Sequence, residues 1–157
     1  MSDRLTVVGG TYYENCIDPE ADDFYGSGMR GAAALSGKGL TINLISCIAK
    51  RDLNLAHSIC STFDIQPEFH FIDKTIIFQY YHPLSLPEIF GLPDNGTSVK
   101  LADCTSTNIL FYGMIEAQIE VHGKRVVYDP QNHISFVETG STANHLALVL
   151  NKKEAHL

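Results

Sequence analysis

The segment LTVVGGTYYENCI, residues 5–17, decides how the rest of the chain is read. Its first four residues are an apolar run that the Gly9–Gly10 pair ends with a turn, which is typical of a buried parallel strand. Residues 11–17 are β-prone but partly polar, which favours a strand exposed on one face. A buried strand that leads into an exposed one predicts a large sheet in the core and a separate small sheet.

The remaining chain alternates between strand-like and helix-like segments. Apolar runs predict strands over 41–48, 108–112, 125–128 and 146–150, the last of them buried, while helices are predicted over 29–39, 53–63 and 115–121. This alternation argues for βαβ units and a mostly parallel sheet. The β-prone runs 68–72 and 75–81 do not fit it and are predicted to form a hairpin of the small sheet. Segments 18–23 and 82–96 are predicted loops.

Composition excludes several classes of function. With 157 residues, 45% of them hydrophobic and 18% charged, the chain is expected to form one globular domain. A formal net charge of −7 and the lack of a Lys/Arg cluster argue against binding to nucleic acid or to a membrane surface. No apolar run approaches the roughly 20 residues that span a bilayer, and the N-terminal residues lack the apolar stretch of a signal peptide.

The cysteines indicate a reducing compartment. Cys16, Cys47, Cys60 and Cys104 are widely spaced, with no C-x-x-C pair and no histidine at zinc-site spacing. Isolated thiols in a chain without an export signal are expected to be reduced, core-filling residues of a cytoplasmic protein. No two histidines have ligand spacing on one element, so no histidine metal site is predicted.

Two segments near the N-terminus could bind a small molecule. Glu14, just beyond the Gly pair, could accept hydrogen bonds from a polyol, although a tight turn with a surface carboxylate explains the same pattern. Gly26, Ser27 and Gly28 open a predicted helix, where free N–H groups can bind hydroxyls or anions. Close packing of the helix start explains those small residues equally well.

Polar residues also follow two later strands. Asn151 and Glu154, after the run LALVL, could orient waters around a cation such as Mg²⁺. The same Asn-x-x-Glu spacing is an ordinary helix N-cap pattern. The sequence DPQ at 129–131 could be functional, or it could be a polar turn.

The order of these signals resembles the ribokinase-like (PfkB) family of carbohydrate and nucleoside kinases. The resemblance covers residues 5–157. It implies a three-layer αβα sandwich with a small β-sheet lid, whose pieces fall near 11–17 and 68–81. Family members continue past N-x-x-E into a G-A-G-D segment with the catalytic base and the nucleotide pocket, and no G-A-G-D occurs here. Residues 1–157 are therefore expected to form one incomplete domain that lacks the C-terminal nucleotide-binding half.

The resemblance also implies roles for single residues. Glu14 matches the position where the family usually has an Asp that binds the acceptor's hydroxyls. Gly26, Ser27 and Gly28 match the Gly-Gly segment that lies against the acceptor and hinges the lid. Asn151 and Glu154 match the motif that shapes the use of magnesium and phosphate, through water.

The sequence also departs from the family pattern. Glu replaces Asp, GSG replaces the plain Gly pair, and the Asn usual a few residues later is missing near residues 30–32. Arg30 is therefore an alternative contact, which could meet an anionic group on the acceptor.

Two functions follow from these expectations. The first is the acceptor-binding half of an ATP- and magnesium-dependent sugar or nucleoside kinase, inactive alone, which associates with itself or with a second chain that supplies the missing half. The second is a non-catalytic module, derived from such a kinase, that binds a small molecule or a protein.

Overall fold

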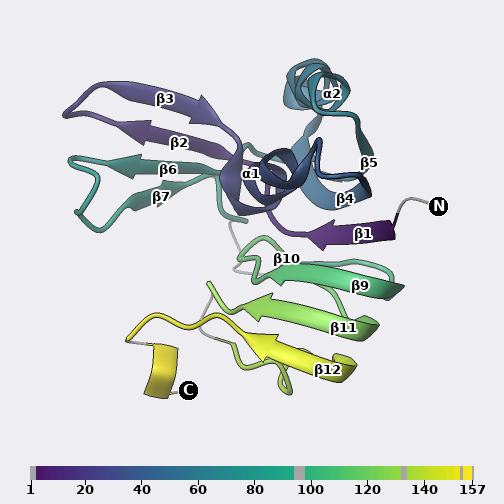
Figure 1. The fold of residues 1–157 in the computed structure, drawn as a ribbon. Helices are drawn as coiled ribbons and strands as arrows, with labels where there is room; N and C mark the ends of the chain where they lie inside the picture. The colour runs from purple at the N-terminus through teal and green to yellow at the C-terminus, as the bar shows by residue number, and fades with distance from the viewer. Residues whose placement is uncertain (1–2, 94–97, 132–133, 153, 157) are drawn as a thin grey trace.

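A six-stranded sheet forms the frame of the protein. The computed structural model describes residues 3–93, 98–131, 134–152 and 154–156. The order is β12-β11-β9-β1-β4-β5, and each strand runs parallel to its neighbours, so the predicted parallel sheet is confirmed (Figure 1). Its strands are β1 (Asp3–Val8), β4 (Leu40–Ala49), β5 (Ile65–Ile72), β9 (Cys104–Tyr112), β11 (Val121–Asp129) and β12 (Thr142–Leu148).

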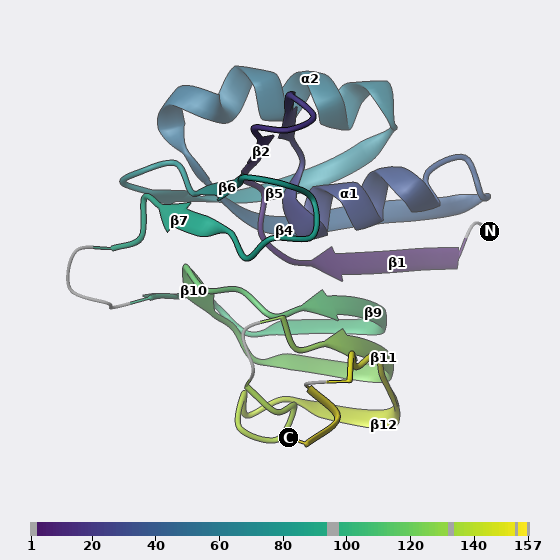
Figure 2. The same ribbon diagram turned by 90° about the vertical axis from the view of Figure 1, so that its left-hand side faces the viewer.

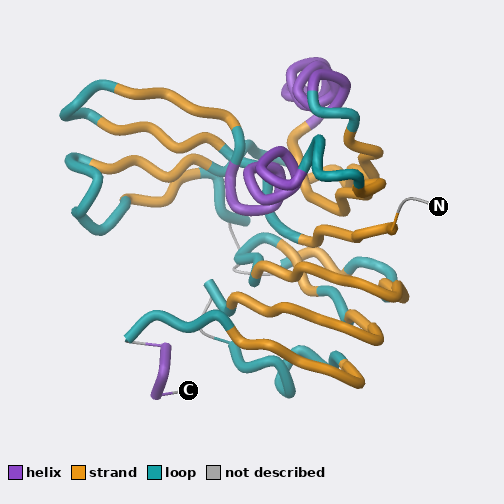
Figure 3. The backbone as a smooth tube through the Cα atoms, in the orientation of Figure 1, coloured by secondary structure: helices purple, strands orange, loops and turns teal. Residues whose placement is uncertain are grey.

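A four-stranded sheet, called the lid below, projects from the edge where the parallel strands end (Figures 1 and 3). Its order is β3-β2-β6-β7, and its strands are β2 (Tyr13–Cys16), β3 (Ala21–Phe24), β6 (Ile77–Tyr80) and β7 (Glu88–Phe90). The chain enters the lid from β1 and again from β5. The separate small sheet predicted from residues 11–17 is therefore present, with β2 inside that segment.

The two described α-helices, α1 (Gly26–Leu35) and α2 (Leu53–Thr62), lie on the same face of the large sheet (Figure 2). Met29 and Ala32 of α1 and Ala56 and Cys60 of α2 belong to one buried cluster with Val7. The opposite face has its own buried cluster, which irregular segments and the short strands β8 (Val99–Lys100) and β10 (Ala117–Gln118) cover. Among the described residues, helices thus supply only one outer layer of the expected αβα sandwich.

The predicted hairpin of 68–72 and 75–81 is wrong. Residues 65–72 form β5, which pairs in parallel with β4 at the edge of the large sheet. Only 77–80 enter the lid, where β6 pairs in parallel with β2. The chain therefore leaves the large sheet at Asp73 and Lys74 and continues toward the lid. β-propensity alone does not show which of two sheets a strand will join.

Three further segments differ from the expected elements. The helix predicted over 115–121 is wrong, because Ala117, Ile119 and Val121 are buried at every second position, the period of a strand. Ala117 belongs to β10, Ile119 lies in the link that follows, and Val121 starts β11. The predicted loops 18–23 and 82–96 contain the start of β3 and all of β7. Neither lid strand has a strong apolar pattern.

The last strand is not buried. The strand predicted over 146–150 forms as part of β12, but Leu146 and Leu148 are about half exposed. They pair in register with Val126 and Tyr128 of β11. On the opposite face, an open hollow is lined by residues that include Leu35, Leu110, Val127 and Ala147. The side of β11 and β12 that carries Val127 thus has little cover in the described part of the chain.

Adjacent residues of β11 test this difference between the two faces. Val126 is 2% exposed, whereas Val127 is 36% exposed. Val126→Ala should lower the free energy of unfolding by about 2 kcal/mol, because it opens a cavity in a packed core. Val127→Ala should change it by less than about 0.5 kcal/mol. Urea denaturation of both variants measures the difference, and equal losses would mean that the Val127 side is covered in solution.

Candidate functional site

The candidate site lies where β1 ends beneath the lid. Two glycines make the packing there possible, because a Cβ on Gly28 would lie 2.4 Å from the carbonyl oxygen of Gly9. The Gly28 N–H donates a 2.9 Å hydrogen bond to the carbonyl of Gly10. Gly26 has a φ of +61°, in the left-handed region that favours glycine. The GSG segment therefore packs the start of α1 directly against the end of β1.

Glu14 and Arg30, both predicted site residues, form an ion pair between the lid and α1. The Arg30 guanidinium donates to Glu14 Oε2, and it also lies 3.9 Å from Asp23 Oδ2 of β3. Its carbon Cζ lies 5.4 Å from the centre of the Tyr25 ring. Arg30 thus already has two carboxylate partners in the chain, so its expected contact with an anionic group on a ligand finds no support here.

Glu116 is a site residue that the sequence reasoning missed. Its side chain is 2% exposed, and Oε1 has no hydrogen-bond partner among the described residues. A Cβ on Gly10 would lie 2.8 Å from that oxygen, so a side chain at position 10 would force the oxygen to shift. Burial raises the pKa of Glu116, and hydrogen bonds from the backbone N–H groups of Ile115 and Glu116 partly offset this.

Tyr12 connects these groups. Burial raises the pKa of Tyr12 to about 12, the neighbouring Ser27 opposes that rise, and the charges of Glu14 and Glu116 add to it. The Tyr12 ring packs on Phe78 of the lid, with 4.5 Å between ring centres. The half-buried phenol of Tyr12 therefore lies beside Ser27 and within reach of the charges of Glu14 and Glu116. A carboxyl oxygen without a partner in such a place can accept a hydrogen bond from a bound hydroxyl.

Asn151 and Glu154 lie at the same edge of the large sheet and cap each other. The Asn151 N–H donates to Glu154 Oε2 at 2.8 Å, and the Glu154 N–H donates to Asn151 Oδ1 at 3.0 Å. This reciprocal pattern is a capping box at the short 3₁₀ helix η2 (Glu154–His156). The pKa of Asp129, at the end of β11, is raised mainly by burial and secondly by the charge of Glu154. Asp129 thus lies near enough to Glu154 to feel its charge, and carboxylates are ligands suited to a hydrated Mg²⁺.

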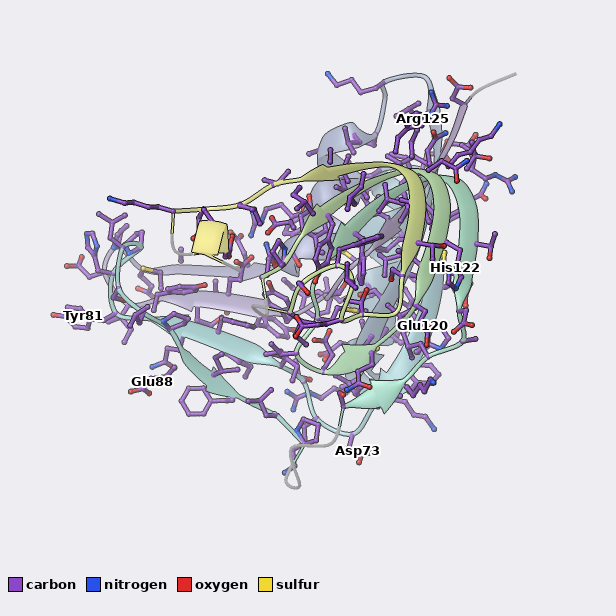
Figure 4. All side chains as sticks on the ribbon, turned by 90° about the horizontal axis from the view of Figure 1, so that it is seen from below. Asp73, Tyr81, Glu88, Glu120, His122 and Arg125 are labelled. Carbon is purple, nitrogen blue, oxygen red and sulfur yellow. The ribbon has the colours of Figure 1, made fainter. Side chains whose placement is uncertain are left out.

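Three other potential metal ligands lie away from this site. Ligand atoms of Asp103, Glu120 and His122 lie within 4.8 Å of one another. Figure 4 shows Glu120 and His122 on the curved sheet, and Tyr81 and Glu88 on the lid at the opposite side of the view. Because these ligands come from separate segments, a search for histidine spacing on one element could not find the group.

The cysteines agree with the expectation of free thiols. All four are unpaired, and three are buried. Burial raises the pKa of Cys47 to about 12 and that of Cys60 to about 11, which makes both thiols poor nucleophiles. Within the described residues, there is no helix of the length and apolar character that a membrane crossing needs.

Comparison with known proteins identifies the fold. No protein-family model and no curated protein sequence matches the chain. A pyrophosphate-dependent kinase of the ribokinase family, solved with a pyrophosphate analog and myo-inositol, aligns with a TM-score of 0.51 and 9% identity over 82% of this chain and 62% of its own. A microbiome-derived acarbose kinase gives 0.48 and 10%, over 96% and 70%. A phosphofructokinase-2 mutant from Escherichia coli gives 0.45 and 10%, over 99% and 68%.

The protein is therefore an α/β protein with a parallel sheet and a β-sheet lid. More narrowly, it has a ribokinase-like fold, as the resemblance in the sequence predicted. At this identity the likeness shows the fold alone. The chain spans 62% of the length of the inositol-bound kinase.

The buried Glu116 should leave a signature in the dependence of stability on pH. A raised pKa means that the folded state holds this proton more tightly than the unfolded chain, so the stabilisation is complete below the ordinary pKa of 4.5 and is lost as the pH rises through the raised pKa. Glu116→Gln should therefore be more stable than the wild type at neutral pH, by about 1–3 kcal/mol, and this advantage should shrink toward acidic pH.

Urea denaturation at both pH values measures this effect. Glu88→Gln, at an exposed glutamate of the lid, is the matched control and should show no such pH-dependent gain. Equal pH profiles for Glu116→Gln and the wild type would contradict the assignment of Glu116 as a buried group with a raised pKa.

Proposed function

We propose that this chain forms the acceptor-binding part of an ATP-dependent sugar or nucleoside kinase, which transfers a phosphoryl group to a hydroxyl. The observation that carries the proposal is the unpartnered Oε1 of Glu116, which faces Gly10 below a lid that bears Glu14. A buried carboxyl oxygen without a partner is costly unless a ligand satisfies it. The ribokinase-like fold agrees with this interpretation but does not by itself fix the activity.

The acceptor would lie between the lid and the end of β1. Glu14 and Arg30 would together hold neighbouring hydroxyls, since one accepts hydrogen bonds and the other donates them. Glu116 would accept a hydrogen bond from a further hydroxyl. Tyr12 and Phe78 would exclude water from the apolar side of the ligand, which would favour phosphoryl transfer over hydrolysis. These residues would position the acceptor and leave the transfer step to other groups.

The phosphate donor would bind at the same edge of the large sheet, near the end of β11. Asp129 and Glu154 would hold a hydrated Mg²⁺ with the help of Asn151, because hard cations prefer oxygen ligands. Bound there, Mg²⁺ would neutralise charge on the phosphates of ATP. The residues of this chain would contribute the orientation of the magnesium-bound waters.

The nucleotide pocket and the catalytic base would come from a further part of the protein or from another chain. The exposed side of β11 and β12 that carries Val127 and Ala147 supports such a partner, because parallel sheets normally have both faces covered. A second copy of the chain is the other candidate to cover it. The free thiols favour a cytosolic location for the assembled enzyme.

A non-catalytic binding module is the second candidate function. The observation that favours it is the capping box, since Asn151 and Glu154 already satisfy each other without a metal. Such a module would keep the acceptor site and lack phosphoryl transfer in any assembly.

Titration calorimetry of the full chain tests the acceptor site. A panel of myo-inositol, fructose, ribose and adenosine serves as probe ligands. At least one should bind, and Glu14→Gln and Glu116→Gln should each weaken that binding by about tenfold or more, since each replaces a carboxyl acceptor with a neutral amide and one of its oxygens with a donor. Glu20→Gln, at an exposed position in the turn after β2, is the control and should bind as the wild type does. Binding that survives both site substitutions unchanged would rule out this placement of the acceptor.

Thermal denaturation with and without Mg²⁺ tests the donor side. Mg²⁺ should raise the midpoint of the wild type by a few degrees at millimolar concentration, because ligands that bind only the folded state stabilise it. Asp129→Asn should lose most of this rise. Asp103→Asn, at a carboxylate of the separate group around His122, should keep it. A full response to Mg²⁺ in Asp129→Asn would contradict the metal assignment.

A further inference from the structure

The lid is strongly acidic. Residues 12–25 contain five acidic side chains and no lysine or arginine. Strand β6 carries no charge, and β7 adds Glu88. An acidic wall beside a binding site favours some ligand charges and repels others, and the repulsion is strongest where water is excluded.

Two of these carboxylates face the site from the lid. Glu14 of β2 lies opposite Asp23 of β3 in the strand register, and Glu14 also lies opposite Phe78 of β6. Residues paired directly across strands point to the same face of a sheet, so these three share one face. Asp22 is one residue earlier in β3, so it points to the other face. The lid therefore presents Glu14 and Asp23 to the site, and Asp22 away from it.

The cation at this face is already neutralised. Arg30 is ion-paired with Glu14 and lies 3.9 Å from Asp23. The arginine near the base of the lid, Arg51, donates to Thr75 Oγ1 at 2.8 Å and lies 3.8 Å from Asp52. Within the described part of the chain, Arg30 and Arg51 therefore each have a carboxylate partner. An anionic group on a ligand would thus meet Glu14 and Asp23 without a cation of its own.

Glu116 strengthens this preference from below. It is nearly fully buried and has an oxygen without a partner, so it is arranged to accept a hydrogen bond from a donor group. A phosphate or carboxylate has no proton to donate at neutral pH, whereas a hydroxyl does. Glu116 below the site and the carboxylates of the lid beside it therefore both favour a hydroxyl over an anionic group.

We infer that the acceptor is an unphosphorylated, polyhydroxylated molecule without anionic groups, and that Glu14 and Asp23 enforce this choice by holding Arg30. This inference rests on the proposed function and makes its substrate class narrower. It assigns to the Glu14–Arg30–Asp23 cluster a role in specificity: the carboxylates neutralise a cation that would otherwise recruit sugar phosphates.

Matched ligand pairs test the inference. The full chain is titrated with fructose and fructose 6-phosphate, and with myo-inositol and myo-inositol 1-phosphate. In each pair that binds, the uncharged member should bind at least about tenfold more tightly, and the gap should narrow as the salt concentration rises. The double variant Glu14→Gln/Asp23→Asn releases Arg30 and should shift the ratio toward the phosphorylated member by about tenfold or more.

Asp22→Asn is the matched control for the double variant. It removes one charge from the same strand but from the opposite face, so it should leave the ratio within about twofold of the wild type, since the exposed side chain of Asp22 points away from Arg30 into solvent. The side chain of Asp23 is 58% exposed, so Asp23→Asn alone should fold normally. This single variant should still shift the ratio in the same direction if Glu14→Gln disturbs the lid.

The outcomes separate this inference from the function on which it rests. If a phosphorylated member binds as tightly as its uncharged counterpart, or more tightly, the inference is wrong and the acceptor site stands. An unchanged ratio in the double variant would also refute the role of the cluster. If no member of any pair binds, the proposed acceptor site itself fails, and the inference fails with it.

Discussion

The close contact between Gly28 and the end of β1 is the constraint on which the site depends. Because no side chain separates them, the first turn of α1 sits directly on the backbone of Gly9. That position brings Ser27 to the hydroxyl of Tyr12, and Arg30 to the carboxylates of the lid. A larger residue at position 28 would push the helix outward and separate the lid from the sheet edge. The glycines therefore act through packing, and we propose that ligand contacts come from their neighbours.

Glu116 shows what this packing allows. A carboxyl group that is buried next to a phenol and leaves one oxygen without a partner destabilises the folded state. Such a cost is typical of functional sites, where a ligand supplies the missing partner. The absence of a Cβ at Gly10 provides the space that the oxygen needs. The Gly9–Gly10 pair thus has two roles. It lets the chain turn after β1, and it leaves space beside Glu116.

The sequence predicts the local elements better than their partners. The run before Gly9, the small residues of α1 and the period of α2 predict β1, α1 and α2, because burial and helix periodicity are local properties. The predicted hairpin failed because the choice between two sheets depends on which strand lies alongside, and β5 finds β4 far away in sequence. Glu14 could be predicted from its position after the Gly pair. Glu116 could not, since its role comes from a fold that brings it to Gly10.

The two faces of β11 connect the candidate site with the part that we propose completes the enzyme. On one face Val126 and Tyr128 are buried in a core that includes Phe136, while on the other Val127 lines a hollow with its neighbour Ala147. A parallel sheet loses stability when an apolar face stays in water, so this half of the sheet is the natural place for a partner to pack. The same strand ends at Asp129, next to Glu154. A part of the enzyme docked on this face would therefore reach the carboxylates that we propose hold the magnesium of the donor.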